Sequence, residues 1–264
     1  MKIKTPVRLT LDSHAVLKEA VDRLAHANPS MSSSRRNFLR NSLTLGGMSL
    51  LTGCNLVDEN SVESALTKIS RFNDQAQAWL FDPNRLAPTY PDSMITRPFP
   101  FNAYYSEDEV REVDGGSFRL EVTGLVADKR RWSLPELRAM PQIEQVTRHI
   151  CVEGWSAIGK WGGVSFSQFL RLVGADLTAK YVGFKCSDDY FTSIDMPTAL
   201  HPQTTLALTY DGQPLPPKYG FPMKLRMPTK LGYKNPKHIQ AIFVTNTYPG
   251  GYWEDQGYNW FGGS

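Results

Sequence analysis

Alternating apolar and polar residues after Ser117 constrain the fold of this chain more than any other feature of the sequence. The stretch F-R-L-E-V-T-G, which stops at Gly124, has the two-residue period of a half-buried strand. Further strand-like runs are predicted at residues 146–150, 181–186, 205–210, 223–227 and 239–245. Two short helices are predicted among them, one capped by Ser133 and one over residues 165–173. Because strands outnumber helices and the two do not alternate regularly, the sequence predicts an α+β domain with mixed or antiparallel sheets and short surrounding helices.

A basic and then weakly apolar segment precedes this domain. From Met31 the sequence reads M-S-S-S-R-R-N-F-L-R-N-S-L-T-L-G-G-M-S-L-L-T-G-C, with a twin-arginine pair at Arg35 and Arg36. The apolar part is too short and too polar to persist as a membrane-spanning helix. The pattern predicts a signal for twin-arginine export to the periplasm. The alternative, an amphipathic core helix, leaves the arginines directly before Leu43 unexplained.

The end of this segment, Leu51-Thr-Gly-Cys54, resembles the lipobox of bacterial lipoproteins, whose cysteine is acylated. Acyl chains on Cys54 would hold the protein at a membrane surface. Ordinary cleavage nearby, with Cys54 incidental, stays open. We expect an N-terminal extension and signal at residues 1–54, a lead-in helix (62–79) and extended arm at 55–100, and the main domain at 101–264.

Composition and missing motifs exclude several classes of function. The net charge of +3 is close to balanced, and no basic stripe is interleaved with aromatic residues as a nucleic-acid groove would require. The sequence contains no Walker loop, no G-x-G-x-x-G after a strand, no H-E-x-x-H and no G-x-S-x-G. Three cysteines allow at most one disulfide, so the fold cannot depend on a disulfide framework.

The stretch R-H-I-C-V-E-G-W-S, residues 148–156, contains the most informative cysteine. A lone cysteine is most often a buried structural thiol. Arg148 and His149 bring positive charge that would favour a thiolate at Cys151, and Gly154-Trp155 predicts a turn beside a large flat wall. On charge and turn chemistry alone, Cys151 is a structural thiol, a nucleophile or a soft metal ligand.

Cys151-Val-Glu-Gly-Trp-Ser, followed by Trp161-Gly-Gly-Val, resembles the molybdenum-binding loop of the sulfite-oxidase-fold molybdopterin oxidoreductases. It is most similar to the bacterial periplasmic branch that includes the catalytic subunit of methionine-sulfoxide reductase. The resemblance covers residues 100–264. It implies the sulfite-oxidase α+β molybdopterin-binding fold, a Mo-molybdopterin cofactor, and Cys151 as the single protein ligand to molybdenum.

The same resemblance implies further site residues. In Phe101-Asn-Ala-Tyr-Tyr-Ser106, Asn102 and Tyr105 contact the pterin, and Ser106 stands where this branch usually has Glu. The strand Tyr181–Cys186 ends at the cofactor, with Cys186 either a nearby thiol or plain packing. The basic stretch after Tyr219 is similar to the pterin-phosphate segment. The remaining residues expected at the cofactor are Tyr219, Lys224, Lys234, Asn235 and Lys237, with His201 as a pocket residue. Arg148 and His149 are then expected to be pocket or cofactor-facing charges rather than activators of the Cys151 thiol.

The function that the resemblance implies is reduction of an S-oxide or N-oxide by oxygen-atom transfer at a Cys-ligated molybdenum. An electron donor such as a membrane haem subunit is expected as partner. Two alternatives remain at this point: oxidation of a small anion such as sulfite, and a cofactor-free lipoprotein that uses the fold as a binding module.

Overall fold

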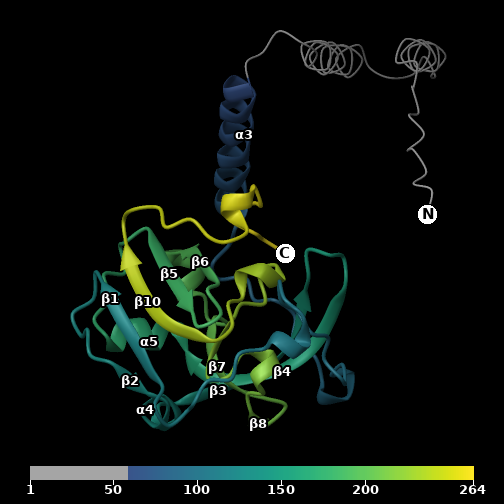
Figure 1. Ribbon diagram of the computed structural model, residues 1–264, viewed down its shortest axis with the longest axis vertical. Helices are drawn as coiled ribbons and strands as arrows, with labels where there is room; N and C mark the ends of the chain where they lie inside the picture. Colours follow the sequence, from purple (N-terminus) through teal and green to yellow (C-terminus); the bar gives the residue numbers. More distant parts are fainter. Residues whose placement is uncertain (1–58) are drawn as a thin grey trace, which may run out of the picture. The chain divides into compact units, whose positions relative to one another are not determined.

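The computed structural model describes residues 59–264, so the predicted export signal and Cys54 lie outside the described residues. Residues Ala65–Ser264 form one compact unit. Figure 1 shows its strands gathered into two sheets. In this described part, no helix combines the length and the apolar character needed to cross a membrane.

The first sheet is mixed. Its strand order is β2-β1-β10-β5-β6, and only β1 and β10 run parallel. The strands are β1 (Arg119–Gly124), β2 (Trp132–Ser133), β5 (Tyr181–Cys186), β6 (Phe191–Asp195) and β10 (Ile239–Thr245).

The second sheet is antiparallel throughout. Its order is β3-β4-β7-β8, and β9 also pairs with β7. The strands are β3 (Gln142–Ile150), β4 (Ser156–Ser165), β7 (Thr205–Tyr210), β8 (Gln213–Pro214) and β9 (Lys224–Arg226). The predicted α+β class with mixed and antiparallel sheets is confirmed.

The helices are few and mostly short, as predicted. They are α3 (Glu59–Leu80), α4 (Leu134–Ala139), α5 (Phe166–Leu172) and α6 (Met196–Leu200), with 3₁₀ turns at Asp92–Met94, Glu107–Glu109, Pro217–Tyr219, Gly232–Lys234 and Glu254–Gln256. At the start of α4, Ser133 is the N-cap, as predicted, and it forms a capping box with Glu136. The helix expected over residues 62–79 is α3.

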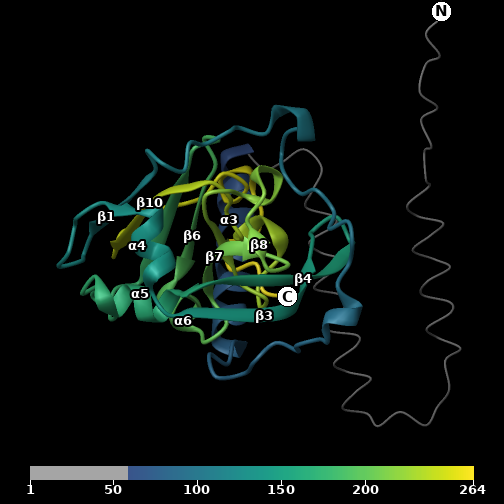
Figure 2. The same ribbon diagram turned by 90° about the horizontal axis from the view of Figure 1, so that it is seen from below.

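The main core lies between the two sheets and includes α5. Leu120 of β1, Phe184 of β5 and Leu206 of β7 are fully buried there with Phe166 and Phe169 of α5. Helix α4 leads into β3, and β4 continues into α5. Figure 2 shows both helices near the same end of the β3–β4 pair. The β3–β4 connection, which carries Cys151, therefore lies at the opposite end of this strand pair.

Strand β4 was not predicted as a strand, because three glycines weaken its strand pattern. The structure gives a physical reason for one of them. A Cβ on Gly163 would lie 1.9 Å from the Leu206 carbonyl oxygen of β7. The backbones of β4 and β7 approach so closely that only glycine fits there. Strand β6 was missed as well.

Two lysines are buried under the C-terminal segment. Lys230 Nζ donates to the Phe261 carbonyl oxygen at 2.9 Å and lies 3.8 Å from Asp195 Oδ1. Lys234 pairs with the buried carboxylate of Glu254. Desolvation by burial lowers the pKa of Lys230 to about 7, although Asp195 acts in the opposite direction.

The folded protein should therefore become more stable as pH rises from about 7 towards the pKa of about 10.4 of an unfolded lysine. In that window unfolded Lys230 binds a proton that folded Lys230 has released, so raising the pH favours the folded state. Lys230→Met should reduce this gain, measured as the urea midpoint at pH 7 and pH 9.5. The exposed Lys129→Met is the control, and an unchanged pH dependence in Lys230→Met would contradict the assignment.

Candidate functional site

Cys151 begins the turn that connects β3 to β4. The Cys151 backbone N–H donates to the Trp155 carbonyl oxygen at 2.9 Å, and the Gly154 N–H donates to the Cys151 carbonyl oxygen at 3.2 Å. Gly154 has a φ of +91°, a conformation that side chains other than glycine rarely adopt. The predicted Gly-Trp turn is thus confirmed, and it fixes the thiol at the end of a strand.

The Cys151 thiol is buried and contacts two polar side chains. Asn102 Nδ2 donates to Sγ at 3.3 Å, and Glu153 Oε2 lies 3.7 Å from Sγ. Burial raises the pKa of the thiol, and the carboxylate of Glu153 raises it further. Neither Arg148 nor His149 offsets this rise, as expected for charges that do not activate the thiol. A metal ion that displaces the thiol proton would supply the missing positive charge.

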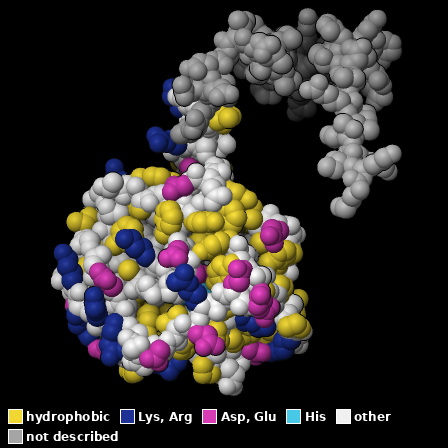
Figure 3. Space-filling view, viewed as in Figure 1, with side chains coloured by type: hydrophobic (Ala, Val, Ile, Leu, Met, Phe, Trp, Pro, Cys, Tyr) yellow, Lys and Arg dark blue, Asp and Glu magenta, His cyan; other side chains and the backbone are white. Residues whose placement is uncertain are grey.

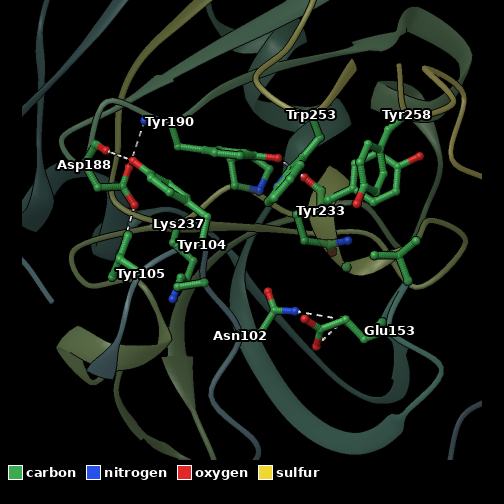
Figure 4. A pocket seen from close by; sticks show the side chains of 16 residues that line it. Asn102, Tyr104, Tyr105, Glu153, Asp188, Tyr190, Tyr233, Lys237, Trp253 and Tyr258 are labelled. Atoms are coloured by element: carbon green, nitrogen blue, oxygen red, sulfur yellow. Dashed lines mark hydrogen bonds between the residues drawn. The ribbon is translucent and has the colours of Figure 1, made fainter. Parts of the chain in front are cut away.

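The thiol opens into a pocket whose walls are largely aromatic, shown in Figure 4. Trp253, Tyr233 and Tyr258 form one side, and Tyr104, Tyr105 and Tyr190 lie towards the other. The remaining lining residues are Asn102, Ala103, Cys151, Val152, Glu153, Asp188, Gly232, Asn235, Pro236 and Lys237. The pocket thus combines one soft sulfur ligand with an apolar, polarisable wall.

One side of the pocket is held together by Asp188. Tyr105 Oη donates to Asp188 Oδ2 at 2.9 Å, and Tyr104 Oη donates to the Asp188 carbonyl oxygen. The Tyr190 N–H donates to Asp188 Oδ1 at 3.3 Å. Burial and the negative charge of Asp188 raise the pKa of Tyr104 to about 12. Asp188 thus fixes three tyrosines of the pocket wall.

Four buried basic side chains, His149, Lys224, Arg226 and Lys237, form what we call the cationic cluster beside this pocket. None of them forms a salt bridge with any residue in the described part of the chain. Burial, reinforced by the neighbouring cations, lowers the pKa of Lys224 well below its usual value. Desolvation lowers the pKa of Lys237 to about 8. Buried basic groups without a carboxylate partner are suited to bind an anionic ligand.

Unpartnered nitrogen atoms mark where that ligand would lie. His149 is fully buried, yet neither ring nitrogen has a hydrogen-bond partner among the described residues. His238 Nε2 and Arg226 Nε are buried without a partner as well. The Cβ of any larger residue at Gly232 would come within 2.8 Å of His149 Nε2, so this glycine leaves the imidazole uncovered. Buried polar groups of this kind are normally satisfied, which indicates a missing polar partner.

The structure brings Asn102, Tyr105, Cys151, Asn235 and Lys237 together at the pocket, in agreement with the sequence analysis. Lys224 also belongs to this group through the cationic cluster. Asn235 acts mainly on the backbone, because its Oδ1 accepts from the Met227 N–H at 2.7 Å. It holds the loop that carries Lys237 rather than offering a free polar group.

Three other predicted site residues have structural partners of their own. Lys234 is neutralised by Glu254, so its ammonium is not available to a phosphate. Ser106 caps a 3₁₀ turn through Glu109. Tyr219 lies in a separate buried aromatic cluster and donates to the Phe99 carbonyl oxygen at 2.9 Å.

Cys186, Arg148 and His201 also lie outside the pocket. Cys186 is part of the main core, and burial raises the pKa of its thiol well above the usual value. The Arg148 side chain is exposed and lies over the ring of Tyr90. His201 Nε2 lies 3.1 Å from the Arg85 carbonyl oxygen, and its Nδ1 accepts from the Gln203 N–H.

Arg226 is a site residue that sequence reasoning missed, whereas His149 was expected, together with Arg148, as a pocket or cofactor-facing charge. The strand pattern distinguishes these two neighbours. Side chains two residues apart on a strand share a face, so His149 rather than Arg148 lies on the same side as Cys151. No comparable signal existed for Arg226, which is placed by contacts far away in sequence: its Nη2 donates to the Arg148 carbonyl oxygen at 2.6 Å.

Comparison with known proteins agrees with this site. The family model described as an oxidoreductase molybdopterin binding domain matches residues 107–253. A putative protein-methionine-sulfoxide reductase subunit from Azospira oryzae is 78% identical over 231 residues, which are 88% of each chain. The catalytic subunit of a protein-methionine-sulfoxide reductase from Xanthomonas campestris is 33% identical over 52% of this chain and 47% of that protein. The solved sulfane dehydrogenase SoxCD from Paracoccus pantotrophus aligns with a TM-score of 0.49 and 18% identity, over 52% of this chain and 40% of that one. The chain belongs to the molybdopterin-binding oxidoreductase family.

The protein is thus an enzyme that uses Mo-molybdopterin, and the alternative of a cofactor-free binding module is set aside. Its residues fit this cofactor. Cys151 would supply one thiolate for molybdenum, and the cationic cluster would supply donors for the anionic phosphate of the pterin. Among the described residues there is no group of three or more His, Cys, Asp or Glu side chains suited to a metal ion.

Replacing Lys224 by Met should lower cofactor retention and, at the same time, stabilise the cofactor-free protein. Loss of a charge-assisted hydrogen bond of about 1.5–3 kcal/mol corresponds to a roughly tenfold to hundredfold weaker hold on the phosphate. The melting temperature of the cofactor-free form should rise, because a desolvated ammonium is removed.

Molybdenum analysis and thermal unfolding measure these two opposite changes. Lys218→Met, which removes a surface lysine paired with Glu107, is the matched control and should retain its molybdenum. An unchanged molybdenum content in Lys224→Met would exclude this lysine from the cofactor site.

Proposed function

We propose that the protein is the catalytic subunit of a periplasmic reductase that acts on S-oxides, with methionine sulfoxide as the substrate. The observation that carries the proposal is the position of the Cys151 thiol, which faces an aromatic pocket on one side of the cationic cluster. The 78% identity to a putative methionine-sulfoxide reductase subunit supports the choice of substrate.

Reduction of a sulfoxide consumes two electrons and two protons and yields a thioether and water. The cofactor, when bound, supplies the redox and oxygen-transfer chemistry. The chain supplies the substrate pocket, where Tyr104, Tyr190 and Trp253 offer ring faces and edges to a thioether or sulfoxide sulfur. Glu153 is held beside the thiol by a hydrogen bond from Trp155 Nε1 at 2.9 Å, and it is positioned to exchange protons at the pocket floor.

The proposal includes export and a partner. The Arg35-Arg36 segment supports twin-arginine export of a folded, cofactor-loaded protein, and Leu51-Thr-Gly-Cys54 supports acylation at Cys54. Since the relative from Xanthomonas campestris is named a catalytic subunit, we include a second subunit, a membrane haem protein, as the electron donor.

Protein matured in a host that makes molybdopterin should oxidise reduced viologen only when methionine sulfoxide is added. Cys151→Ser should lose its molybdenum and lower this turnover by more than about a hundredfold, because the thiolate ligand is absent. Cys186→Ser is the matched control, since Cys186 belongs to the core and should leave both molybdenum and turnover in place.

Two outcomes would contradict the proposal. Sulfite-dependent reduction of an acceptor, with no turnover of methionine sulfoxide, would assign the oxidase reaction instead. Full molybdenum occupancy in Cys151→Ser would exclude Cys151 as the ligand.

A further inference from the structure

Helix α3 packs on the domain through its polar side. Asp74 Oδ1 accepts from the Phe261 N–H at 2.9 Å, and Gln77 Oε1 accepts from the Gly263 N–H at 3.4 Å. The carboxylate of Asp74 and the carboxamide of Gln77 thus both accept hydrogen bonds from the backbone of the C-terminal segment. A helix on a soluble domain usually does the reverse and buries its apolar side.

The apolar side of α3 is exposed. Its large members, which we call the α3 stripe, recur at the spacing of one helical face and have exposed fractions of 61% for Leu66, 56% for Ile69, 69% for Phe72, 83% for Trp79 and 72% for Leu80. Five large apolar side chains are thus exposed on one side of a single helix, and apolar surface gathered in this way marks interaction sites.

A basic residue borders this stripe. Lys68, eleven residues before Trp79 and so on nearly the same side of the helix, is exposed. The single acidic residue between residues 65 and 80 is Asp74, which is turned towards the domain. Figure 3 shows both hydrophobic and basic side chains at the surface of this helix. An apolar face with Trp and Phe, edged by Lys, is typical of helices that lie in the interface of an anionic membrane.

We propose that α3 lies flat in the headgroup region of an anionic bilayer, with the α3 stripe inserted and Lys68 at the phosphates. The position of α3 in the chain supports this occupant over another protein. Four residues separate Cys54 from the start of α3 at Glu59, and a step of five residues spans at most about 18 Å. If Cys54 is acylated, as the proposed function includes, the stripe is held within reach of the same membrane.

The proposal also has a consequence for the catalytic domain. The residues that fix α3 to the domain, Asp74 and Gln77, bind the segment that ends at Ser264. A membrane-bound α3 would thus hold the whole domain beside the bilayer, independently of lipid on Cys54. The catalytic domain would then encounter a membrane-bound electron donor at the membrane surface rather than by three-dimensional diffusion.

A fluorophore placed on each side of α3 in the full-length, cofactor-loaded protein tests this geometry. We would attach an environment-sensitive dye at Phe72→Cys within the stripe and, as the matched position, at the exposed Ala78→Cys away from it. With vesicles of phosphatidylglycerol and phosphatidylethanolamine, the emission of the dye at residue 72 should shift to the blue. Its quenching by iodide should be several-fold weaker than without vesicles. The dye at residue 78 should stay open to iodide. This comparison does not depend on whether an acyl chain also holds the protein.

Charge reversal tests the phosphate contacts. Lys68→Glu should weaken the protection at residue 72, as should neutral phosphatidylcholine vesicles or high salt. Lys129→Glu changes the net charge by the same amount at an exposed site elsewhere, and should keep the protection.

Equal iodide quenching at residues 72 and 78 on anionic vesicles would overturn the proposal. Protection at residue 72 without vesicles, rising with protein concentration, would also overturn it and assign the stripe to a second copy of this chain. Methionine-sulfoxide turnover with viologen in solution should be the same for all these variants, so failure of this proposal and failure of the proposed function are distinguishable.

Discussion

Burial of positive charge without a carboxylate counterpart is the constraint on which the rest of this structure depends. His149, Lys224 and Arg226 are removed from water beside the Cys151 pocket, and their pKa values are lowered chiefly by that desolvation. Such an arrangement destabilises the protein alone and is tolerated because the surrounding sheets pack tightly. A tightly bound anion repays part of this cost, so cofactor binding and fold stability are linked.

The same constraint separates the basic residues into two kinds. Lys230 and Lys234 are as deeply buried as the cationic cluster, but each has a carboxylate partner: Asp195 for one and Glu254 for the other. They fasten the C-terminal segment to the domain. Arg226 and Lys237 of the cluster donate to backbone carbonyl oxygens, but no member of the cluster forms a salt bridge with a described residue. This difference, rather than burial or charge alone, distinguishes a binding site from a structural ion pair.

The scaffold that holds the cluster is built from backbone contacts. β3 and β4 pair along their whole length, which places Cys151 and His149 at one end of a stiff hairpin. Strand β4 lies between β3 and β7, and Gly163 allows the close approach to Leu206 that this position requires. Arg226, from the short β9, crosses to the Arg148 carbonyl oxygen and ties the basic segment to the Cys151 strand.

By itself, the sequence determined the α+β class, the capped start of α4, the presence of helix α3 and the Cys151 turn, because each depends on local periodicity, capping or glycine at a positive φ. It also identified Asn102, Tyr105, Cys151 and Lys237 as site residues, through motifs that resemble a known family. Only the tertiary structure decided which basic residues face the pocket. Lys234 and Lys237 are three residues apart in one segment, yet one meets Glu254 and the other meets the pocket. Likewise, only packing turned the polar side of α3 towards the C-terminal backbone. Partners so distant in the chain leave no local signal, since charge and polarity in a sequence do not specify what lies opposite them in space.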